Sequence, residues 1–454
     1  MTNLTTFVLY YSLFQKELFD NKKEIMKYFP ANVFGVFTTV RRAIPLKTYP
    51  TDVHGCIGFW DNDFKVLSPE SLYRHLLRVS HDSVWKDERR RFFGPIEREP
   101  ETILEIDFML NPIYSIHPTT GMISVINKGF SNKRFGIIIQ RGAQKATYLP
   151  NVFPDISWKE LVISIKEKAG ITSDDFELFA YKIHQIKSTY STILTSALFT
   201  YISVHHFSRL LIGNMNVSFQ FPFAYSYKQS QLEWNATDQV RNISTLSDIF
   251  RYATIYKGLA TKQELKAIKQ KIINILKEID KYTSQALSFL GFMFQSFRLK
   301  STPFCQKLLS DLPNAEREFE KPEIIIGLNK AGCKKEKEIP TLNPTDSIFR
   351  MNWAIQQIIS YKKKPSMEDI AILKRKIADI LLNKGSTETN YLAVAFESLC
   401  FAYKPTLLHM LFELFFELEQ RKNCNHTLYS FLDKTSRIDI TGHVLNGLVQ
   451  LSSP

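Results

Sequence analysis

Hydrophobic and polar residues follow two different periods along this chain, and the change of period divides it. Residues 103–110 alternate apolar and acidic side chains, and residues 33–40 are rich in β-branched and aromatic side chains, as in half-buried strands. Residues 135–139 form a short apolar run that also suits a strand, while residues 71–80 and 158–169 have helical periodicity. The first part of the chain therefore predicts an α+β fold with a mainly antiparallel sheet.

The second part of the chain has helical periodicity almost throughout. From residue 244 to the end, strand patterns vanish, and Gly and Pro fall between the apolar runs. A charged, Pro-flanked stretch at 320–345 is predicted to be a flexible loop. We expect an α+β domain at 1–190, a connector with an aromatic-rich, strand-like segment at 191–243, and an all-α domain at 244–454.

The helical part contains an internal repeat. The segment LSDIFRYATIY at 246–256 is echoed by TDSIFRMNWAI at 345–355, which begins 99 positions later. The helix that follows each copy is echoed as well, by KIINIL at 271–276 and KIADIL at 376–381, and a third approximate copy lies at 441–448. A period near 100 residues predicts two helical hairpins per repeat and a ring of six hairpins. The alternative is that amphipathic helices simply resemble one another.

Composition and charge narrow the class of protein. The chain has 44% hydrophobic and 23% charged residues, with a net charge of +13. Its basic residues are scattered and interrupted by acidic ones, so nucleic acid is not expected as a partner. The N-terminus lacks the features of a signal peptide, and the apolar stretches at 196–213 and 407–418 carry charged residues. We expect a soluble, cytoplasmic protein that does not contact a membrane.

Five cysteines bear on metal binding and on the redox compartment. They are odd in number and far apart, without a CxxC pair, which argues against a disulfide framework and against a zinc site. A reducing compartment is therefore expected, no metal site is predicted, and the cofactor is unknown. The cysteines are Cys56, Cys305, Cys333, Cys400 and Cys424.

The His-Gly-Cys-Ile-Gly sequence at 54–58 is the most distinctive short motif. Glycines on both sides of Cys56 predict a tight turn that brings backbones close together. Cys56 is either a small buried residue in that turn or a reactive thiol. On a strand, His54 and Cys56 would share a face, and His54 could then lower the pKa of the thiol as a tentative catalytic pair.

Several blocks around this motif resemble the AMMECR family, which is named for a chromosomal region deleted with Alport syndrome. The family's hallmark is a Gly-x-Phe-Val-Thr-Leu strand that leads to Leu-Arg-Gly-Cys-Ile-Gly. The resemblance covers about residues 30–188 and departs from the pattern at His54, which replaces an Arg, at Ala146, which replaces a Gly, and at Asn151, which replaces a Gln. The matching blocks are GVFTTV (35–40), VHGCIG (53–58), WKDERRRFFGPI (85–96), EPETILEIDFML (99–110) and GIIIQRGAQKATYLPNV (136–152).

The resemblance implies an α+β domain with a cleft lined by the Gly-Cys turn. Family members are linked with Memo-type proteins and radical-SAM proteins, so it also implies a protein partner or a redox or modification role. His54 puts a carried-over anion-binding role in doubt, because imidazole lacks the bidentate geometry of guanidinium. The candidate ligand-binding residues are Gly55, Gly58, Asp87, Arg91, Phe92, Arg141, Pro150 and Asn151.

The connector and the first helix after it weakly resemble the start of α/α-toroid proteins. Aromatic residues alternate at 221–227, and the segment LEWNATDQVRN at 232–242 leads into the helix, with Asn242 where the toroid pattern has His and Ser244 where it has Gly. Such rings often process sugars with aromatic platforms and paired carboxylates. No close carboxylate pair is evident, which favours the alternative that these residues form the core or bridge helices. The candidate centre residues are Tyr225, Tyr227, Trp234, Asp238, Arg241, Arg251, Asp346, Arg350, Trp353, Glu397 and His443.

Three functions are compatible with the sequence. The first is an interaction protein whose N-terminal cleft binds a small ligand or a partner, with a helical scaffold; this interpretation is favoured slightly. The second is an enzyme or enzyme accessory that uses Cys56. The third is a carbohydrate-active α/α toroid fused to a regulatory domain, so that a small molecule or a glycan would be the ligand.

Overall fold

The chain divides into two compact units, Met1–Ile193 and Leu194–Pro454, each of which is described by itself. Within the helices and strands of these units, the side chains at 2–3, 24, 92–93, 198, 222–226, 231–234, 429–430 and 435–439 are not described. The computed structural model describes residues 2–15, 22–42, 52–93, 96–124, 126, 128–153, 155–216, 220–226, 231–234, 238–294, 302–315, 320–333, 339–421, 429–430 and 435–452.

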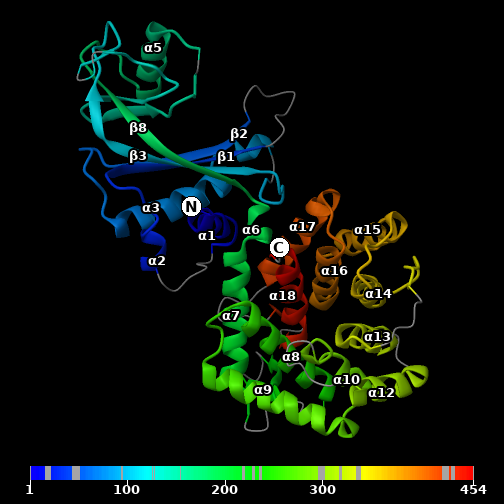
Figure 1. The fold of residues 1–454 in the computed structure, drawn as a ribbon. Helices are drawn as coiled ribbons and strands as arrows, with labels where there is room; N and C mark the ends of the chain where they lie inside the picture. The colour runs from blue at the N-terminus through cyan, green and yellow to red at the C-terminus, as the bar shows by residue number, and fades with distance from the viewer. Residues whose placement is uncertain are drawn as a thin grey trace. The chain divides into compact units, whose positions relative to one another are not determined.

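The N-terminal unit is built on a curled, six-stranded antiparallel sheet with the order β2-β1-β3-β8-β6-β7 (Figure 1). The two longest strands, β3 and β8, pair along most of their length and join the two halves of the sheet. The α+β fold expected from the alternating patterns is thus confirmed. The strands of this unit are β1 (Val33–Arg41), β2 (Val53–Trp60), β3 (Ile103–Ser115), β4 (Met122–Ile123), β5 (Lys128–Gly129), β6 (Gly136–Arg141), β7 (Gln144–Tyr148) and β8 (Glu177–Thr189).

Helix α3 (Pro69–Trp85) covers one face of the sheet beside β1 and β2. Ser68 caps its first turn by accepting a hydrogen bond from the backbone of Ser71, and Pro69 suits the first helical position. Leu72, Leu76 and Val79 are buried at a helical spacing. Burial of each such side chain contributes about 1.5–3 kcal/mol, so the apolar stripe holds the helix on the sheet.

Helix α5 (Trp158–Ala169) packs on β6 and β7 at the other end of the sheet. Ser157 and Glu160 form a capping box at its start, and Gly170 ends it with a left-handed backbone, φ 68°. Its observed bounds match the predicted helix at 158–169. The other helices of this unit are α1 (Thr2–Phe14), α2 (Lys22–Met26) and α4 (Arg90–Phe93), and α6 (Thr192–Thr195) lies at the division between the units.

Six helices of the C-terminal unit form a closed order of neighbours. Helix α8 contacts α10, and the contacts continue through α13, α14 and α16 to α18, which contacts α8 again. The helical character expected after residue 244 is confirmed, and this order agrees with the ring that the repeat predicts. The expected absence of strands there is wrong, since two short strands lie at Tyr429–Ser430 and Thr435–Arg437. Assignment to the α/α-toroid fold stays a prediction. These ring helices are α8 (Gln239–Ile255), α10 (Ser284–Ser288), α13 (Glu320–Ala331), α14 (Ile348–Ser360), α16 (Thr389–Phe401) and α18 (Ile438–Ser452).

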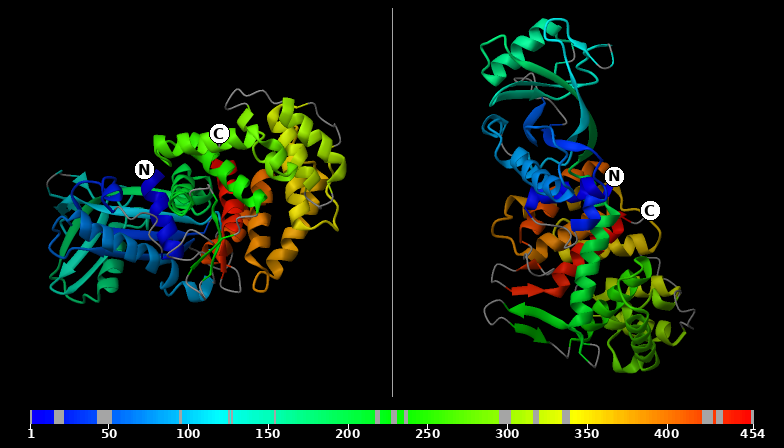
Figure 2. Two further views of the ribbon diagram at one scale, coloured as in Figure 1. Left: turned by 90° about the horizontal axis from the view of Figure 1, so that it is seen from below. Right: turned by 90° about the vertical axis from the view of Figure 1, so that its left-hand side faces the viewer.

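Further helices pack outside the ring, and the repeat follows this division. The two SxIFR-type segments lie in ring helices α8 and α14, and the two KIxxIL segments lie in α9 and α15, which follow them. In the left view of Figure 2, the helices of this unit run from green through yellow and orange to red around a common centre. A small sheet with the order β10-β9-β12-β11 accompanies the helices. These elements are α7 (Ala197–Gly213), α9 (Lys262–Lys277), α12 (Thr302–Asp311), α15 (Met367–Leu382), α17 (Leu408–Arg421), β9 (Pro222–Ser226), β10 (Gln231–Trp234), β11 (Tyr429–Ser430) and β12 (Thr435–Arg437), with short 3-10 turns at Ile279–Lys281, Leu312–Asn314 and Pro405–Leu407.

Two predictions about the helical unit are wrong. The stretch predicted as a loop at 320–345 begins with α13, because its charges flank a buried apolar run that includes Ile324 and Leu328. Cys305 and Cys333, expected to be unpaired, form a disulfide, since packing of α12 on α13 brings their Cα atoms within 5.8 Å.

The disulfide and the apolar segments bear on the predicted compartment. Disulfides persist mainly in oxidising compartments, so this one does not support the expected reducing environment. Among the helices that the structure describes, none has the length and apolar character needed to cross a bilayer. A cytoplasmic location stays a prediction.

Candidate functional site

The Gly-Cys motif lies on a strand, which corrects the predicted turn. Residues 54–58 belong to β2, an edge strand that pairs with β1, and neither Gly55 nor Gly58 has a positive φ. A Cβ at Gly55 would lie 2.0 Å from the carbonyl oxygen of Ser83 in α3, and one at Gly58 would lie 2.2 Å from the ring of Phe37. The glycines therefore permit close packing on both faces of the strand instead of bending the chain.

Cys56 lies in a polar but satisfied environment. Its backbone N–H donates to Asp87 Oδ2 at 2.9 Å, and Thr39 Oγ1 donates to its sulfur at 3.2 Å. Burial raises the pKa of the Cys56 thiol above its ordinary value, and the Thr39 hydrogen bond and the charge of Arg89 offset part of this shift. The thiol is therefore mainly protonated near neutral pH. A catalytic role for Cys56 stays a prediction.

His54 lies at an irregularity in the pairing of β1 and β2. Val40 pairs with Gly55 but Arg41 pairs with Val53, so His54 is the extra residue of a β-bulge. The bulge interrupts the alternation on which a face shared with Cys56 would depend. Burial, followed by the charges of Arg42 and Arg90, lowers the pKa of His54 to about 4. His54 is consequently neutral at physiological pH, and the tentative pair with Cys56 stays a prediction.

The other candidate residues of the AMMECR-like part do not gather around Cys56. Asp87 contacts it directly and is itself held by Arg89, whose guanidinium donates to both carboxylate oxygens at 2.8 Å. Arg91 and Arg141 are exposed, and Phe92 has no described side chain. Pro150 is half-buried, while Asn151 is exposed with φ 63° and donates its backbone N–H to Asn132.

A row of polar residues across three strands was not predicted from the sequence. Thr39 pairs with Cys56 on one side and with Glu105 on the other, so the three side chains lie in one row of the sheet. Asp107 follows on the same face of β3, accepts a hydrogen bond from Gln185 at 2.8 Å, and has its pKa raised by burial to about 6. The alternation of acidic residues at 103–110 was the signal, but only the strand order connects them to Cys56. This row of Cys56, Thr39, Glu105 and Asp107 is called the sheet row below.

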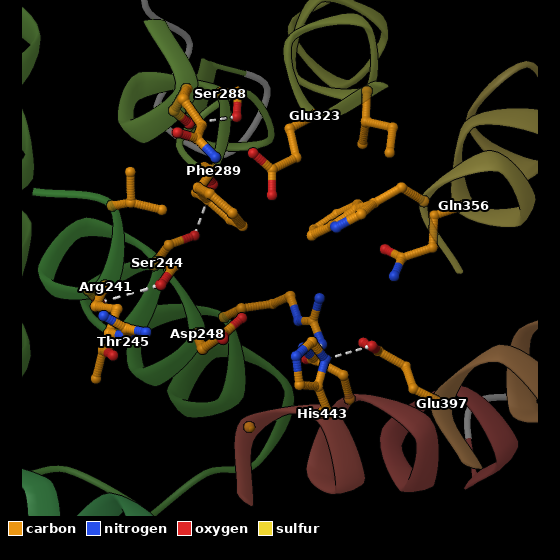
Figure 3. A pocket seen from close by; sticks show the side chains of 18 of the residues that line it. Arg241, Ser244, Thr245, Asp248, Ser288, Phe289, Glu323, Gln356, Glu397 and His443 are labelled. Atoms are coloured by element: carbon orange, nitrogen blue, oxygen red, sulfur yellow. Dashed lines mark hydrogen bonds and ion pairs between the residues drawn. The ribbon is translucent and has the colours of Figure 1, made fainter. Parts of the chain in front are cut away.

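A second candidate site is the cavity inside the helical ring, with a volume of about 480 Å³ (Figure 3). All six ring helices contribute to its wall. In α8, for example, Arg241, Ser244, Asp248 and Arg251 recur at three- and four-residue spacing and so line one face of the helix. This enclosure is called the ring cavity below.

The ring cavity brings together many of the predicted centre residues. Tyr227 lies outside the described residues, and Tyr225 and Trp234 have no described side chains. Asp346 and Arg350 do not line the cavity and instead form an ion pair, with Arg350 Nε 3.3 Å from Asp346 Oδ1. The predicted residues that line it are Asp238, Arg241, Arg251, Trp353, Glu397 and His443.

Two carboxylates of the cavity wall are held by neighbouring groups. Glu397 is 2% exposed and accepts hydrogen bonds from Asn352 Nδ2 at 2.8 Å and from His443 Nδ1 at 2.6 Å. Asp238 caps α8 and forms an ion pair with Arg241. These contacts fix both carboxylates in place before any ligand binds.

Other groups of the wall have unused hydrogen-bonding capacity. Asp248 makes no hydrogen bond or ion pair with any described residue, and burial raises its pKa to about 6 against the opposing charge of Arg251. Arg251 donates Nη2 to Asn446 Oδ1 at 2.6 Å, while its Nε is buried without a partner in the described parts of the chain.

Lys330 also faces the cavity space. Its side chain is exposed to the space of the cavity, yet protein surrounds that space, and the resulting desolvation, followed by the charge of Arg251, lowers its pKa to about 8. Asp248, Lys330 and Glu323 were not predicted. Asp248 follows Arg241 by two helical turns, so the period of α8 could have identified it. Lys330 and Glu323 lay in the segment predicted as a loop.

Aromatic side chains complete the wall of the ring cavity. Phe289 and Trp353 meet edge to face with ring centroids 6.1 Å apart, and Phe349 also lines the space. In Figure 3, Asp248, Glu323, Glu397 and His443 surround the same space from different helices. Among the described residues there is no cluster of three or more His, Cys, Asp or Glu suited to hold a metal ion.

Comparison with known proteins bears on the N-terminal unit. The AMMECR1 family model matches residues 9–189, a span that includes the whole six-stranded sheet and part of α1. No curated protein matches the chain. The match contains all the blocks on which the resemblance rested, and it ends at the last residue of β8. Residues 9–189 of this chain are an AMMECR1 domain.

Proposed function

We propose that the helical unit binds a small carbohydrate, or a polyhydroxylated molecule of similar size, in the ring cavity. The observation that carries this proposal is that all six ring helices direct polar or aromatic side chains into one enclosure. Its volume of about 480 Å³ lies within the range of about 300–1,000 Å³ found for small-ligand pockets. A scaffold with no ligand would be expected to fill its centre with apolar side chains.

The chemistry of the wall supports a ligand with many hydroxyl groups. Asp238–Arg241 and Glu397–His443 are already paired, and the wall carries two further carboxylates, Asp248 and Glu323, and two further cations, Arg251 and Lys330. The charges roughly balance, which favours a neutral ligand. Hydroxyl groups both donate and accept hydrogen bonds, so a sugar can use groups of either sign.

The aromatic and amide groups fit the same ligand. The faces of sugar rings are apolar C–H surfaces, which pack on aromatic side chains such as Trp353, Phe289 and Phe349. Gln356 and Asn390 provide additional amide donors and acceptors in the wall. Asp248, with its pKa near 6, is the group best suited to donate a proton if the site also carries out acid–base chemistry.

The test is calorimetric titration of the full chain with maltose, cellobiose and chitobiose. We expect at least one of them to bind. Gln356→Ala should weaken binding about five- to tenfold through loss of one hydrogen bond, and Trp353→Ala should weaken it further. Arg375→Gln, at an exposed residue of α15, is the matched control and should bind the sugars with the affinity of the wild type. Absence of binding at millimolar sugar, or equal binding by all variants, would overturn the proposal.

A second candidate function concerns the AMMECR1 domain. The sheet row contains Asp107, a buried carboxyl with its pKa raised to about 6, next to Cys56, Thr39 and Glu105. Perturbed titratable groups of this kind cluster at functional sites. The row supports the proposal that this domain binds a small ligand or a partner of the Memo or radical-SAM type around Cys56.

A purified Memo-type protein provides a direct test of this second function. Its affinity for the full chain can be measured by interferometry with the wild type and with Cys56→Ser and Asp107→Asn. The proposal expects binding by the wild type and at least tenfold weaker binding by the variants, since each removes a group of the row. Binding that both variants retain would place the interaction elsewhere on the molecule.

A further inference from the structure

A hollow of about 310 Å³ lies beside α3 in the N-terminal unit, apart from the sheet row. Arg74, Arg78, Asp82 and Lys86 follow one another at four-residue spacing along its edge, since residues four apart lie on one face of a helix. Lys22, at the start of α2, also faces the hollow.

The hollow contains more positive charge than its own carboxylate can neutralise. Asp82 is its one described acidic lining residue, and it is engaged by Lys86, whose Nζ lies 2.8 Å from Asp82 Oδ1. Lys22, Arg74 and Arg78 have no carboxylate partner among the described residues. Three cations around one concavity attract an anion, because their fields add in a site with low-dielectric walls.

Two of these cations are held by aromatic groups instead of acids. Lys22 Nζ lies 5.6 Å from the ring centroid of Tyr73, and the Arg78 guanidinium lies 5.8 Å from that of Phe59. These contacts orient the side chains without cancelling their charge. Arg74 is exposed and makes no contact of this kind with a described residue.

The remaining lining suggests what the anion is attached to. Half-buried Tyr11 lies next to the cations, and the buried side chains of Tyr73 and Leu77 line the floor of the hollow, so its apolar part is mainly aromatic. The planar guanidinium of arginine donates two hydrogen bonds to phosphate oxygens. Two arginines one helical turn apart can therefore bind the same phosphate group. We propose that this hollow is a binding site for a small phosphomonoester with an aromatic or apolar body. The site is independent of the sugar site proposed for the helical unit.

The experiment is calorimetric titration of the full chain with phenyl phosphate, with inorganic phosphate and phenol as separate probes. Phenyl phosphate is expected to bind best, phenol should not bind, and the affinity should fall at high salt because the attraction is electrostatic. The double variant Arg74→Gln/Arg78→Gln should bind at least tenfold more weakly. Arg134→Gln, at another exposed arginine of the same unit, should bind like the wild type.

The possible results separate this site from the others. Equal affinity for inorganic phosphate and phenyl phosphate would overturn the assignment of the tyrosines to the ligand body. Failure of phenyl phosphate to bind at millimolar concentration, or unchanged binding by the double variant, would overturn the whole site. Because both arginines are exposed, the double variant should keep the wild-type circular dichroism spectrum and the wild-type response to sugars.

Discussion

The sheet row and the ring cavity both contain acidic side chains with little access to water, but they differ in the hydrogen-bond partners that the protein provides for these side chains. In the sheet, Asp107 accepts a hydrogen bond from Gln185, and Glu105 accepts one from Arg41 at 2.7 Å. In the ring cavity, Asp248 has no such partner in the described structure. Burial raises the pKa of Asp107 and of Asp248 to about 6, yet only one of the two is already satisfied by protein.

The difference separates a pre-formed network from a site with spare capacity. Burial of a polar group without a hydrogen-bond partner lowers the stability of the folded state. Such groups therefore occur mainly where a ligand or a water molecule supplies the missing hydrogen bond. The sheet row is closed by its own hydrogen bonds and is well suited to hold Cys56 in a fixed position. The ring cavity leaves Asp248 and the Nε of Arg251 without partners among the described residues, which supports the ligand site proposed for it.

The largest expected effect concerns what holds the ring cavity together. The Cys305–Cys333 disulfide closes a 28-residue separation and ties the C-terminal end of α13 to α12. Helix α13 supplies Glu323 from its first turn and Lys330 from its last turn to the ring cavity. The double variant Cys305→Ser/Cys333→Ser should lower the free energy of unfolding of the helical unit by about 3–4 kcal/mol, according to the loop-entropy model. Urea denaturation and hydrogen exchange of the ring helices measure this loss.

The control for that variant is the sheet. Hydrogen exchange of β1 and β3 should not change, because the disulfide lies entirely within the other unit. An unchanged urea midpoint for the helical unit would show that the disulfide does not support the ring.

The next effect concerns the geometry of the sheet row. Gly55→Ala places a Cβ 2.0 Å from the backbone carbonyl of Ser83, so β2 or α3 has to shift. The free energy of unfolding of the N-terminal unit should fall by about 3 kcal/mol, at the upper end for overpacking. Gly129→Ala, where a Cβ meets nothing within 4 Å, is the matched control and should cost less than about 0.5 kcal/mol. Equal urea midpoints for the two variants would contradict the close approach of α3 to β2.

A smaller effect is the pH dependence of stability caused by Asp248, a carboxyl of the ring cavity that has no hydrogen-bond partner among the described residues. Because the pKa of Asp248 is about 6 in the folded protein and about 3.9 in an unfolded chain, the folded state binds more protons between these values. Its contribution to stability is therefore full below about pH 4 and is lost as the pH rises through 6. Between pH 4 and pH 7, the free energy of unfolding of Asp248→Asn should vary with pH by about 1–2 kcal/mol less than that of the wild type. This effect is smaller than the full pKa difference between the folded and unfolded states would give, because the carboxyl keeps some access to cavity water.

Asp379→Asn on exposed α15 provides the control for the pH experiment, and its pH dependence should equal that of the wild type. Sugar binding offers a further distinction between the two units. A ligand that contacts Asp248 should change its pKa in NMR titrations and leave that of Asp107 unchanged. Equal shifts at both carboxyls would show that the effect is not confined to the ring cavity.

Most features that depend on residues close together in the sequence were predicted correctly, and most features that depend on distant residues were not. Helix α5 and ring helices α8 and α14 were predictable because their apolar period depends on residues three and four apart. The same helical period helped to identify Arg241, Trp353 and other candidates that line the ring cavity. The sheet row could not be predicted, because it depends on register between strands that lie far apart in the sequence.

The errors have local physical causes. Glycines in β2 indicated a turn because their usual role is conformational freedom, whereas here they allow Ser83 and Phe37 to approach. Cys305 and Cys333 carried no spacing motif, and only the packing of α12 on α13 brings them together. The charges at the ends of α13 masked an apolar centre that packs inward.

The smallest expected effect concerns Cys56 itself and could reverse the comparison. Since burial raises the pKa of its thiol, iodoacetamide should alkylate Cys56 more slowly than free cysteine at neutral pH, with a rate that rises only at alkaline pH. Thr39→Val removes the hydrogen bond to the sulfur and should slow the reaction further, about two- to threefold, because that bond favours the thiolate. Mass spectrometry of the labelled peptide distinguishes Cys56 from buried Cys400. Rapid alkylation with an apparent pKa below that of free cysteine would instead mean that the sheet row activates its thiol, and the AMMECR1 domain would then be the reactive part of the molecule.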